Sequence, residues 1–95
     1  MARSSADIET ENGSRYLQQL CKHWSHKMVT EFDADQGRVD FPSGARLILE
    51  AGDKILHLQL DAPEDNLERM EGVVADHLER FAFREELTFP WARTA

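Results

Sequence analysis

Residues 45–61 read ARLILEAGDKILHLQLD, and this stretch decides the fold. Along residues 54–61 every second residue is apolar, and the apolar side consists of Leu56, Leu58 and Leu60. A period of two is typical of a β-strand with one buried face. Gly52 and Asp53 separate this segment from the apolar residues 45–51, and a leading glycine suits a type II′ hairpin, in which it has positive φ. The stretch therefore predicts two antiparallel strands joined by a tight turn.

The same period continues toward the N-terminus. Residues 28–33 and 38–41 predict two more strands, which end at the turn sequences Asp35-Gln36-Gly37 and Pro42-Ser43-Gly44. Connections this short force neighbouring strands to be antiparallel, so residues 28–62 form a four-stranded meander. Residues 6–11 alternate weakly and predict a further strand at the sheet edge. The sheet should therefore contain four to five strands.

Two amphipathic helices flank the meander. The first is predicted over residues 15–27, with Ser14 as its N-cap. The second is predicted over residues 63–83, with Pro63 in the first turn. Their apolar stripes consist of Tyr16, Leu17, Leu20, Cys21 and Trp24 in the first helix and of Leu67, Met70, Val74, Leu78 and Phe81 in the second. Leu87, Phe89 and Trp91 alternate after the second helix and predict an extended tail.

These elements predict one α+β domain over residues 1–95, in the order β-α-β-β-β-β-α. Each helix has a single apolar stripe, so both should cover the same face of the sheet. The other face should be left open to solvent. The polar residues predicted to line it are Glu31, Arg38, Asp40, Arg46, Glu50, His57 and Gln59.

The charge balance limits the classes of partner. Eighteen acidic and eleven basic residues give a net charge of −7, which disfavours binding to nucleic acid or to anionic membrane surfaces. No apolar run approaches the roughly 20 residues that span a bilayer, and the first residues lack an apolar signal core, so we expect a cytoplasmic protein. Cys21 is the only cysteine, which excludes an intrachain disulfide and a thiolate zinc cluster.

Residues 15–27 and 77–87, together with residues 37–42 and Trp91, resemble a small bacterial domain family of unknown function. The resemblance extends over nearly the whole chain and implies no catalytic residues. Domains of this kind occur beside, or fused to, siderophore-interacting flavin reductases, which implies a link to iron uptake. The strand order is similar to the TATA-binding-protein-like arrangement, an analogy of fold that does not define a function.

No catalytic motif is recognisable in the chain, and no metal site or cofactor is predicted. The candidate ligand-binding residues on the open face are Arg38, Arg46, His57 and Gln59. His23 and His26 are three residues apart on the first helix and could contact one ligand. Their simpler interpretation is a cationic helix end that complements the helix dipole. His77 lies on an apolar stripe and should be a core histidine bonded to a backbone carbonyl.

Three functions remain open. The first, which the sequence favours, is a non-enzymatic binding or accessory domain that holds a protein partner or a small ligand on the open sheet face, with iron-siderophore handling as the setting that the resemblance implies. The second is a small metal- or ligand-dependent enzyme that uses the helix or sheet-face histidines. The third is a structural homodimer in which Phe89 and Trp91 pack across the subunits.

Overall fold

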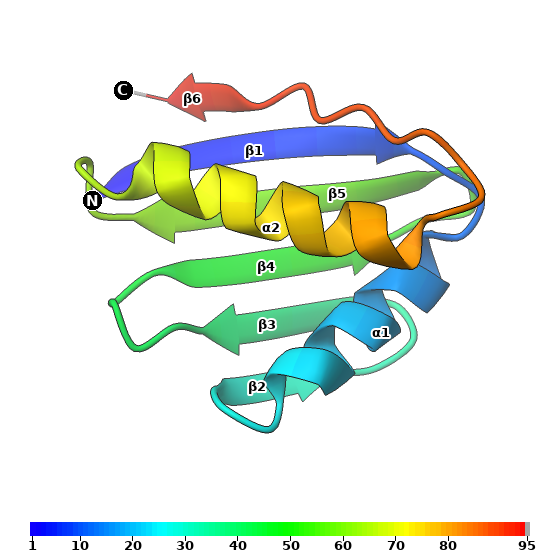
Figure 1. The fold of residues 1–95 in the computed structure, drawn as a ribbon, viewed down its shortest axis with the longest axis horizontal. Helices are drawn as coiled ribbons and strands as arrows, with labels where there is room; N and C mark the ends of the chain where they lie inside the picture. The colour runs from blue at the N-terminus through cyan, green and yellow to red at the C-terminus, as the bar shows by residue number, and fades with distance from the viewer. Residues whose placement is uncertain (95) are drawn as a thin grey trace.

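The computed structural model describes residues 1–94, in which two helices cover one face of a six-stranded sheet (Figure 1). The predicted α+β class is confirmed. Neighbouring strands follow the order β2-β3-β4-β5-β1-β6, and every pair is antiparallel. The elements are β1 (Ala2–Glu9), α1 (Gly13–Trp24), β2 (Val29–Phe32), β3 (Gln36–Asp40), β4 (Arg46–Ala51), β5 (Ile55–Ala62), α2 (Leu67–Phe81) and β6 (Ala92–Thr94).

The first strand is longer and more central than the sequence predicts. It begins at Ala2 rather than Ala6, and it lies between β5 and β6 rather than at an edge. Its pairing with β5 is continuous from Ala2 opposite Ala62 to Glu9 opposite Ile55. This backbone pairing explains why a segment with few apolar residues forms a strand, since sheet formation depends more on neighbours than on intrinsic propensity.

The chain end supplies the sixth strand. Residues 92–94 of β6 pair with residues 3–5 of β1, so the predicted extended tail ends as an edge strand. Phe89 and Trp91 are half-buried and pack against the core of their own chain. The apolar tail that motivated a homodimer is therefore largely used within one molecule.

Both helices are shorter than predicted. The first ends at Trp24, where the backbone N–H groups of Lys27 and Met28 turn back to its carbonyl, each at 3.0 Å. Ser14 lies inside this helix and donates to the carbonyl of Ala34 at 2.5 Å, so it is not the N-cap. The second begins at Leu67, after a turn closed by the Pro63 carbonyl. No helix within residues 1–94 is long and apolar enough to cross a membrane.

The β4–β5 turn and the β3–β4 connection differ from each other in backbone geometry. The N–H of Gly52 donates to the carbonyl of Ile55 at 2.8 Å, so Asp53 and Lys54 form the centre of that turn, one residue later than predicted. The type II′ assignment is wrong because, among residues 1–94, Gly44 is the only residue with positive φ, at 93°. Gly44 closes the connection between β3 and β4, where a left-handed conformation favours glycine.

The core lies between the helices and one face of the sheet. In Figure 1 both helices cross in front of the same face, with α1 over β3 and β4 and α2 over β5 and β1. Leu56, Leu58 and Leu60 on β5 have no solvent exposure, as the alternation predicts. Gly37 on β3 lets α1 approach closely, since a Cβ at that position would lie 2.8 Å from Cys21 Sγ.

Candidate functional site

The side of the sheet turned away from the helices carries the candidate site, and we call it the open face. Opposed residues of antiparallel strands point to the same side, so the register identifies its members. All the residues predicted to line this side lie on it. The open face consists of Arg3, Ser5, Asp7, Glu9, Val29, Glu31, Gln36, Arg38, Asp40, Arg46, Ile48, Glu50, Ile55, His57, Gln59, Asp61, Ala92 and Thr94.

Four of these residues form a row of alternating charge across β3, β4, β5 and β1. In that order they are Asp40, Arg46, Asp61 and Arg3, each directly opposite the next, and we call them the charge ladder. Arg46 Nε donates to Asp40 Oδ1 at 2.6 Å, and Arg3 Nε donates to Asp61 Oδ1 at 2.7 Å. The hydrogen bond from Arg3 to Asp61 raises the pKa of that arginine above its ordinary value. Arg3 is therefore held in its charged form by Asp61.

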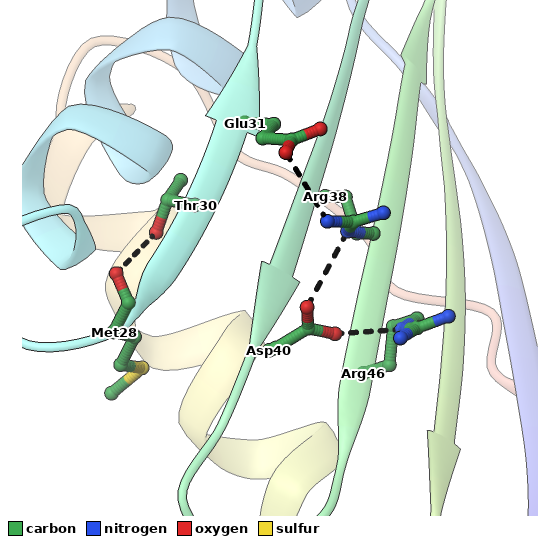
Figure 2. A network of polar contacts seen from close by, with 6 residues as sticks. All are labelled: Met28, Thr30, Glu31, Arg38, Asp40 and Arg46. Atoms are coloured by element: carbon green, nitrogen blue, oxygen red, sulfur yellow. Dashed lines mark hydrogen bonds and ion pairs between the residues drawn. The ribbon is translucent and has the colours of Figure 1, made fainter.

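A third arginine, Arg38, contacts the ladder from the side, as Figure 2 shows. Arg38 lies between Glu31, with N···O at 3.5 Å, and Asp40, at 3.4 Å. Asp40 thus faces two arginines, one on its own strand and one on β4. The Nε of Arg38, which is the atom 3.4 Å from Asp40 Oδ2, is buried and makes no hydrogen bond with any residue in 1–94. Beside this network, Thr30 Oγ1 donates to the Met28 carbonyl at the sheet edge.

The opposite end of the open face is acidic. His57 Nδ1 contacts Asp7 Oδ1 on β1, and Glu50 on β4 lies opposite His57 on its other side. The imidazole is therefore held by Asp7, with Glu50 as its cross-strand neighbour. Between this end and the charge ladder lies an uncharged stretch formed by Ile48, Gln59 and Ser5.

Two shallow hollows indent the open face. The larger, about 810 Å³, is lined by the charge ladder together with Met1, Phe41, Gly44, Ala45 and Thr94. The smaller, about 340 Å³, lies over β2, β3 and β4 and includes Arg38 and Ile48 in its lining. Two of the predicted ligand residues, Arg38 and Arg46, thus line hollows, whereas His57 and Gln59 lie on the flatter part of the same face.

The two helix histidines lie away from this surface. The ring of His23 is 5.5 Å from the ring of His77 and 6.1 Å from that of Phe81, so this exposed side chain lies beside α2. His26 follows the end of α1, in the turn that the Lys27 and Met28 N–H groups close on the Trp24 carbonyl. His77 is half-buried with Nδ1 2.7 Å from the Val73 carbonyl, as predicted for a core histidine.

Metal-binding and nucleophilic groups do not gather within the described residues. Across residues 1–94, no three histidine, cysteine, aspartate or glutamate side chains are close enough together to hold a metal ion. Cys21 has no solvent exposure, and burial raises the pKa of its thiol to about 11. The thiol is therefore protonated at neutral pH and is not an activated nucleophile.

Sequence reasoning missed one buried polar group. Glu71 of α2 is only 7% exposed, although acidic side chains on a helix are mostly solvated. Ser4 Oγ donates to it at 2.6 Å, and Arg93 of β6 donates at 2.7 Å. Burial favours a higher pKa for Glu71, but the hydrogen bonds from Arg93 and Ser4 outweigh it and lower the pKa. The spacing holds a signal, because Glu71 is four residues after Leu67 and lies on the apolar stripe.

A second carboxylate ties the chain after α2 to the start of α1. Glu85 accepts hydrogen bonds from the Tyr16 hydroxyl at 2.5 Å and from the Asn12 side chain at 2.8 Å. The hydrogen bonds from Tyr16 and Asn12 lower the pKa of Glu85. Glu71 and Glu85 both lie on the helix side of the sheet, so they organise the fold and not the open face.

The fold and the open face define a small α+β domain with one uncovered sheet surface. The chain belongs to the family described as "Uncharacterized protein conserved in bacteria (DUF2218)", which matches residues 5–92. It is similar to PA4090 from Pseudomonas aeruginosa, whose NMR structure has 40% sequence identity, a TM-score of 0.80, and coverage of 97% of this chain and 96% of that one. No curated protein matches the chain. The predicted membership in a bacterial family of unknown function is confirmed.

Proposed function

We propose that this protein is a non-catalytic binding domain that uses the open face as its docking surface. The observation that carries this proposal is that the two sides of the sheet differ in how they are covered. Both helices cover one side, and no element in residues 1–94 covers the other. The uncovered side nevertheless carries an ordered set of charges and two hollows of about 810 and 340 Å³.

The positions of the cysteine and of the sheet-face histidine support a binding role rather than a catalytic one. The Cys21 thiol is buried and protonated. Asp7 orients the His57 ring on a flat part of the sheet, and no described residue supplies a serine or cysteine nucleophile in hydrogen-bond contact with it. Nucleophilic catalysis needs such a contact between nucleophile and base. We therefore assign these groups no reaction.

Charged side chains held in fixed positions are suited to recognition. Arg38 and Arg46 present planar guanidinium groups, which bind carboxylates and similar oxygen ligands in a bidentate manner. Asp40 holds both of them in place from one side. A ligand that enters the smaller hollow meets Arg38, whereas a ligand in the larger one meets Arg46 and Arg3.

The setting we propose is the handling of iron-siderophore complexes in the cytoplasm. It rests on the family resemblance to domains found with siderophore-interacting flavin reductases. Hydroxamate and catecholate siderophores present oxygen-rich rims, which match the arginine donors of the open face. The uncharged stretch at Ile48 and Gln59 could contact the less polar parts of such a ligand.

The test is an NMR titration of the intact chain with gallium-loaded siderophores, one hydroxamate and one catecholate. Gallium(III) replaces iron(III) without paramagnetic broadening. We expect signals of the Arg38 and Arg46 side chains and of the Gln59 amide to shift on binding. The Arg46→Ala variant should weaken binding, and Arg69→Ala, on the exposed side of α2, serves as the matched control. Shifts confined to the helix side, or equal affinity of the two variants, would refute the open face as the docking surface for these ligands.

A further inference from the structure

The open face has a symmetry that points to one particular partner. With six strands in the order β2-β3-β4-β5-β1-β6, the centre of the sheet lies between β4 and β5. The charge ladder is centred on the same line, with one aspartate and one arginine on each side. Building on the proposed docking role of this face, we infer that its partner is the open face of a second copy of this chain.

A two-fold axis parallel to the strands, between β4 and β5, places the two sheets face to face and reverses the strand order of the second copy. Asp40 then faces Arg3 of the partner subunit, and Arg46 faces Asp61 of the partner subunit. The two remaining contacts are the same pairs seen from the other copy. Each residue of the charge ladder thus faces a residue of opposite charge in the second copy. This is the self-complementarity that a two-fold interface requires.

The other rows of the open face obey the same rule. In the uncharged stretch, Ile48 faces Gln59 of the partner subunit, and Arg38 faces the partner's Ser5. In the acidic row, Glu50 faces the partner's His57. Gln36 in turn faces Asp7 of the partner subunit. No like charges meet in these rows, so electrostatic repulsion at the contact is avoided.

An axis across the strands can be distinguished from this one. It would leave the strand order unchanged and place each residue of the central row against its own copy. Arg38 would then face the partner's Arg38, and Glu31 would face the partner's Glu31. Like charges placed directly opposite one another disfavour an interface. The axis across the strands would also place Arg46 against the partner's Glu50 and Arg3 against the partner's Asp7, so both arrangements join opposite charges. The axis along the strands does so without a like-charge contact in these rows, and it is the arrangement we infer.

The size of the face sets the expected strength. Strands about 4.8 Å apart make the sheet about 24 Å wide, and its eight-residue strands run about 27 Å. Two such faces bury on the order of 1,000 Å² or slightly more, which is at the lower limit of specific interfaces. The existing pairs need not break, because each arginine has five N–H donors and can bind a carboxylate of each copy. We therefore expect a weak, reversible dimer.

The experiment is sedimentation equilibrium of the intact chain from about 5 μM to 1 mM. At 0.15 M salt the Debye length is about 8 Å, which screens the long-range repulsion between two chains of net charge −7. We expect the mass to rise from 10.9 kDa toward twice that value. For each variant alone, Arg46→Asp or Asp61→Arg, the dimer dissociation constant should be at least about tenfold higher than for wild type. The reason is that like charges then face each other in the homodimer.

The decisive sample is an equimolar mixture of these two variants. In the mixed dimer the introduced carboxylate at position 46 faces the introduced guanidinium at position 61, and the two unchanged groups also form an opposite pair. We expect the mixture to recover the association that each variant loses. A wild-type chain that stays at 10.9 kDa at 1 mM overturns the inference. Variants that associate like wild type, or a mixture that stays monomeric while wild type dimerises, overturn it as well.

Circular dichroism would report whether the charge reversals unfold the chain. A further variant therefore tests the same interface and leaves the charge ladder intact. Gln59→Ile replaces both Ile48–Gln59 contacts with apolar ones and should strengthen the dimer. Gln18→Ile on the exposed side of α1 is the matched control and should not. Equal association of the two variants counts against the inference. If every sample is monomeric but the gallium siderophores still shift open-face signals, the second copy is refuted as the partner, and the docking role of the face stands.

Discussion

The two faces of strand β5 show how differently one segment can be used. On the covered side, Leu56, Leu58 and Leu60 have no solvent exposure and meet the helices. On the other side, His57 and Asp61 make paired contacts with β1 and remain partly accessible. Burial of a leucine stabilises a fold by about 1.5–3 kcal/mol, whereas an exposed ion pair contributes about 0–1 kcal/mol. The ion pairs of the open face therefore add little to stability. Their ordered arrangement supports a role in recognition.

The largest expected effect comes from the covered side. Leu58→Ala should reduce the free energy of unfolding by about 2–5 kcal/mol, because it removes buried methyl groups and leaves a cavity under the helices. The adjacent Gln59→Ala on the open face is the matched control and should stay within about 0.5 kcal/mol of wild type. Urea unfolding of both variants measures the contrast. Equal losses would contradict the division of the sheet into a core face and a docking face.

The next effect tests the close approach of α1 to β3. Gly37→Ala should cost about 1–3 kcal/mol, because the added methyl group would lie 2.8 Å from Cys21 Sγ. Cys21→Ala removes that sulfur, so the double variant should lose less than the sum of the two single variants. A double-mutant cycle by urea unfolding measures the coupling. Strict additivity would mean that the helix does not pack on the sheet at this point.

The third effect concerns the polar group beneath α2. Glu71→Gln should lower stability at pH 7 by about 1–2 kcal/mol, because Ser4 and the half-exposed Arg93 lose a charged acceptor. The pKa of Glu71 lies below its ordinary value of 4.5 in the folded chain. The stability it contributes is therefore complete above about pH 5 and is lost as the pH falls below 4.5 through the folded pKa.

The measurement is the free energy of unfolding of wild type and Glu71→Gln at several pH values between about 3 and 7. The difference between the two should shrink toward acid. A difference that stays constant with pH, or grows as the pH falls, would show that the carboxylate is not held in its charged form. Glu68→Gln, on the exposed side of the same helix, should show almost no difference from wild type at any pH.

The smallest effect on stability should come from the charge ladder. Arg46→Ala breaks the 2.6 Å contact with Asp40 but should cost at most about 1 kcal/mol, since the arginine is 53% exposed. Arg69→Ala, on α2, is the control for loss of an exposed arginine. A loss of several kcal/mol in Arg46→Ala alone would mean that the ladder is a structural device and would weaken its assignment to docking.

The sequence predicts the meander, the helices and the composition of the open face because each depends on local periodicity. The alternation around Leu58 and the stripe through Leu17 and Leu20 specify which side of each element is buried. Four of the six candidate ligand residues lie on that open face as expected. His23 and His26, both predicted on the first helix, belong to α1 and the turn after it, on the covered side of the sheet.

The remaining features depend on contacts between segments that are far apart in sequence. Residues 2–5 form a strand only because β5 and β6 pair with both of their edges. Arg93 reaches Glu71, which also accepts from Ser4, only after residues 92–94 have been placed at the sheet edge. The centring of the charge ladder follows from the strand order, which brings the first strand between the fifth and the sixth. Periodicity alone does not contain this information.

The most direct measurement records NMR side-chain signals of the intact chain from about 10 μM to 1 mM. We expect the Nε–H signal of Arg46 and the side-chain amide of Gln59 to shift with concentration as the open faces meet. The side-chain amides of Gln18 and Asn66, on the helix side, should stay in place. Movement of the helix-side signals instead, or no movement of the open-face signals up to 1 mM, would contradict docking of a second copy on this surface.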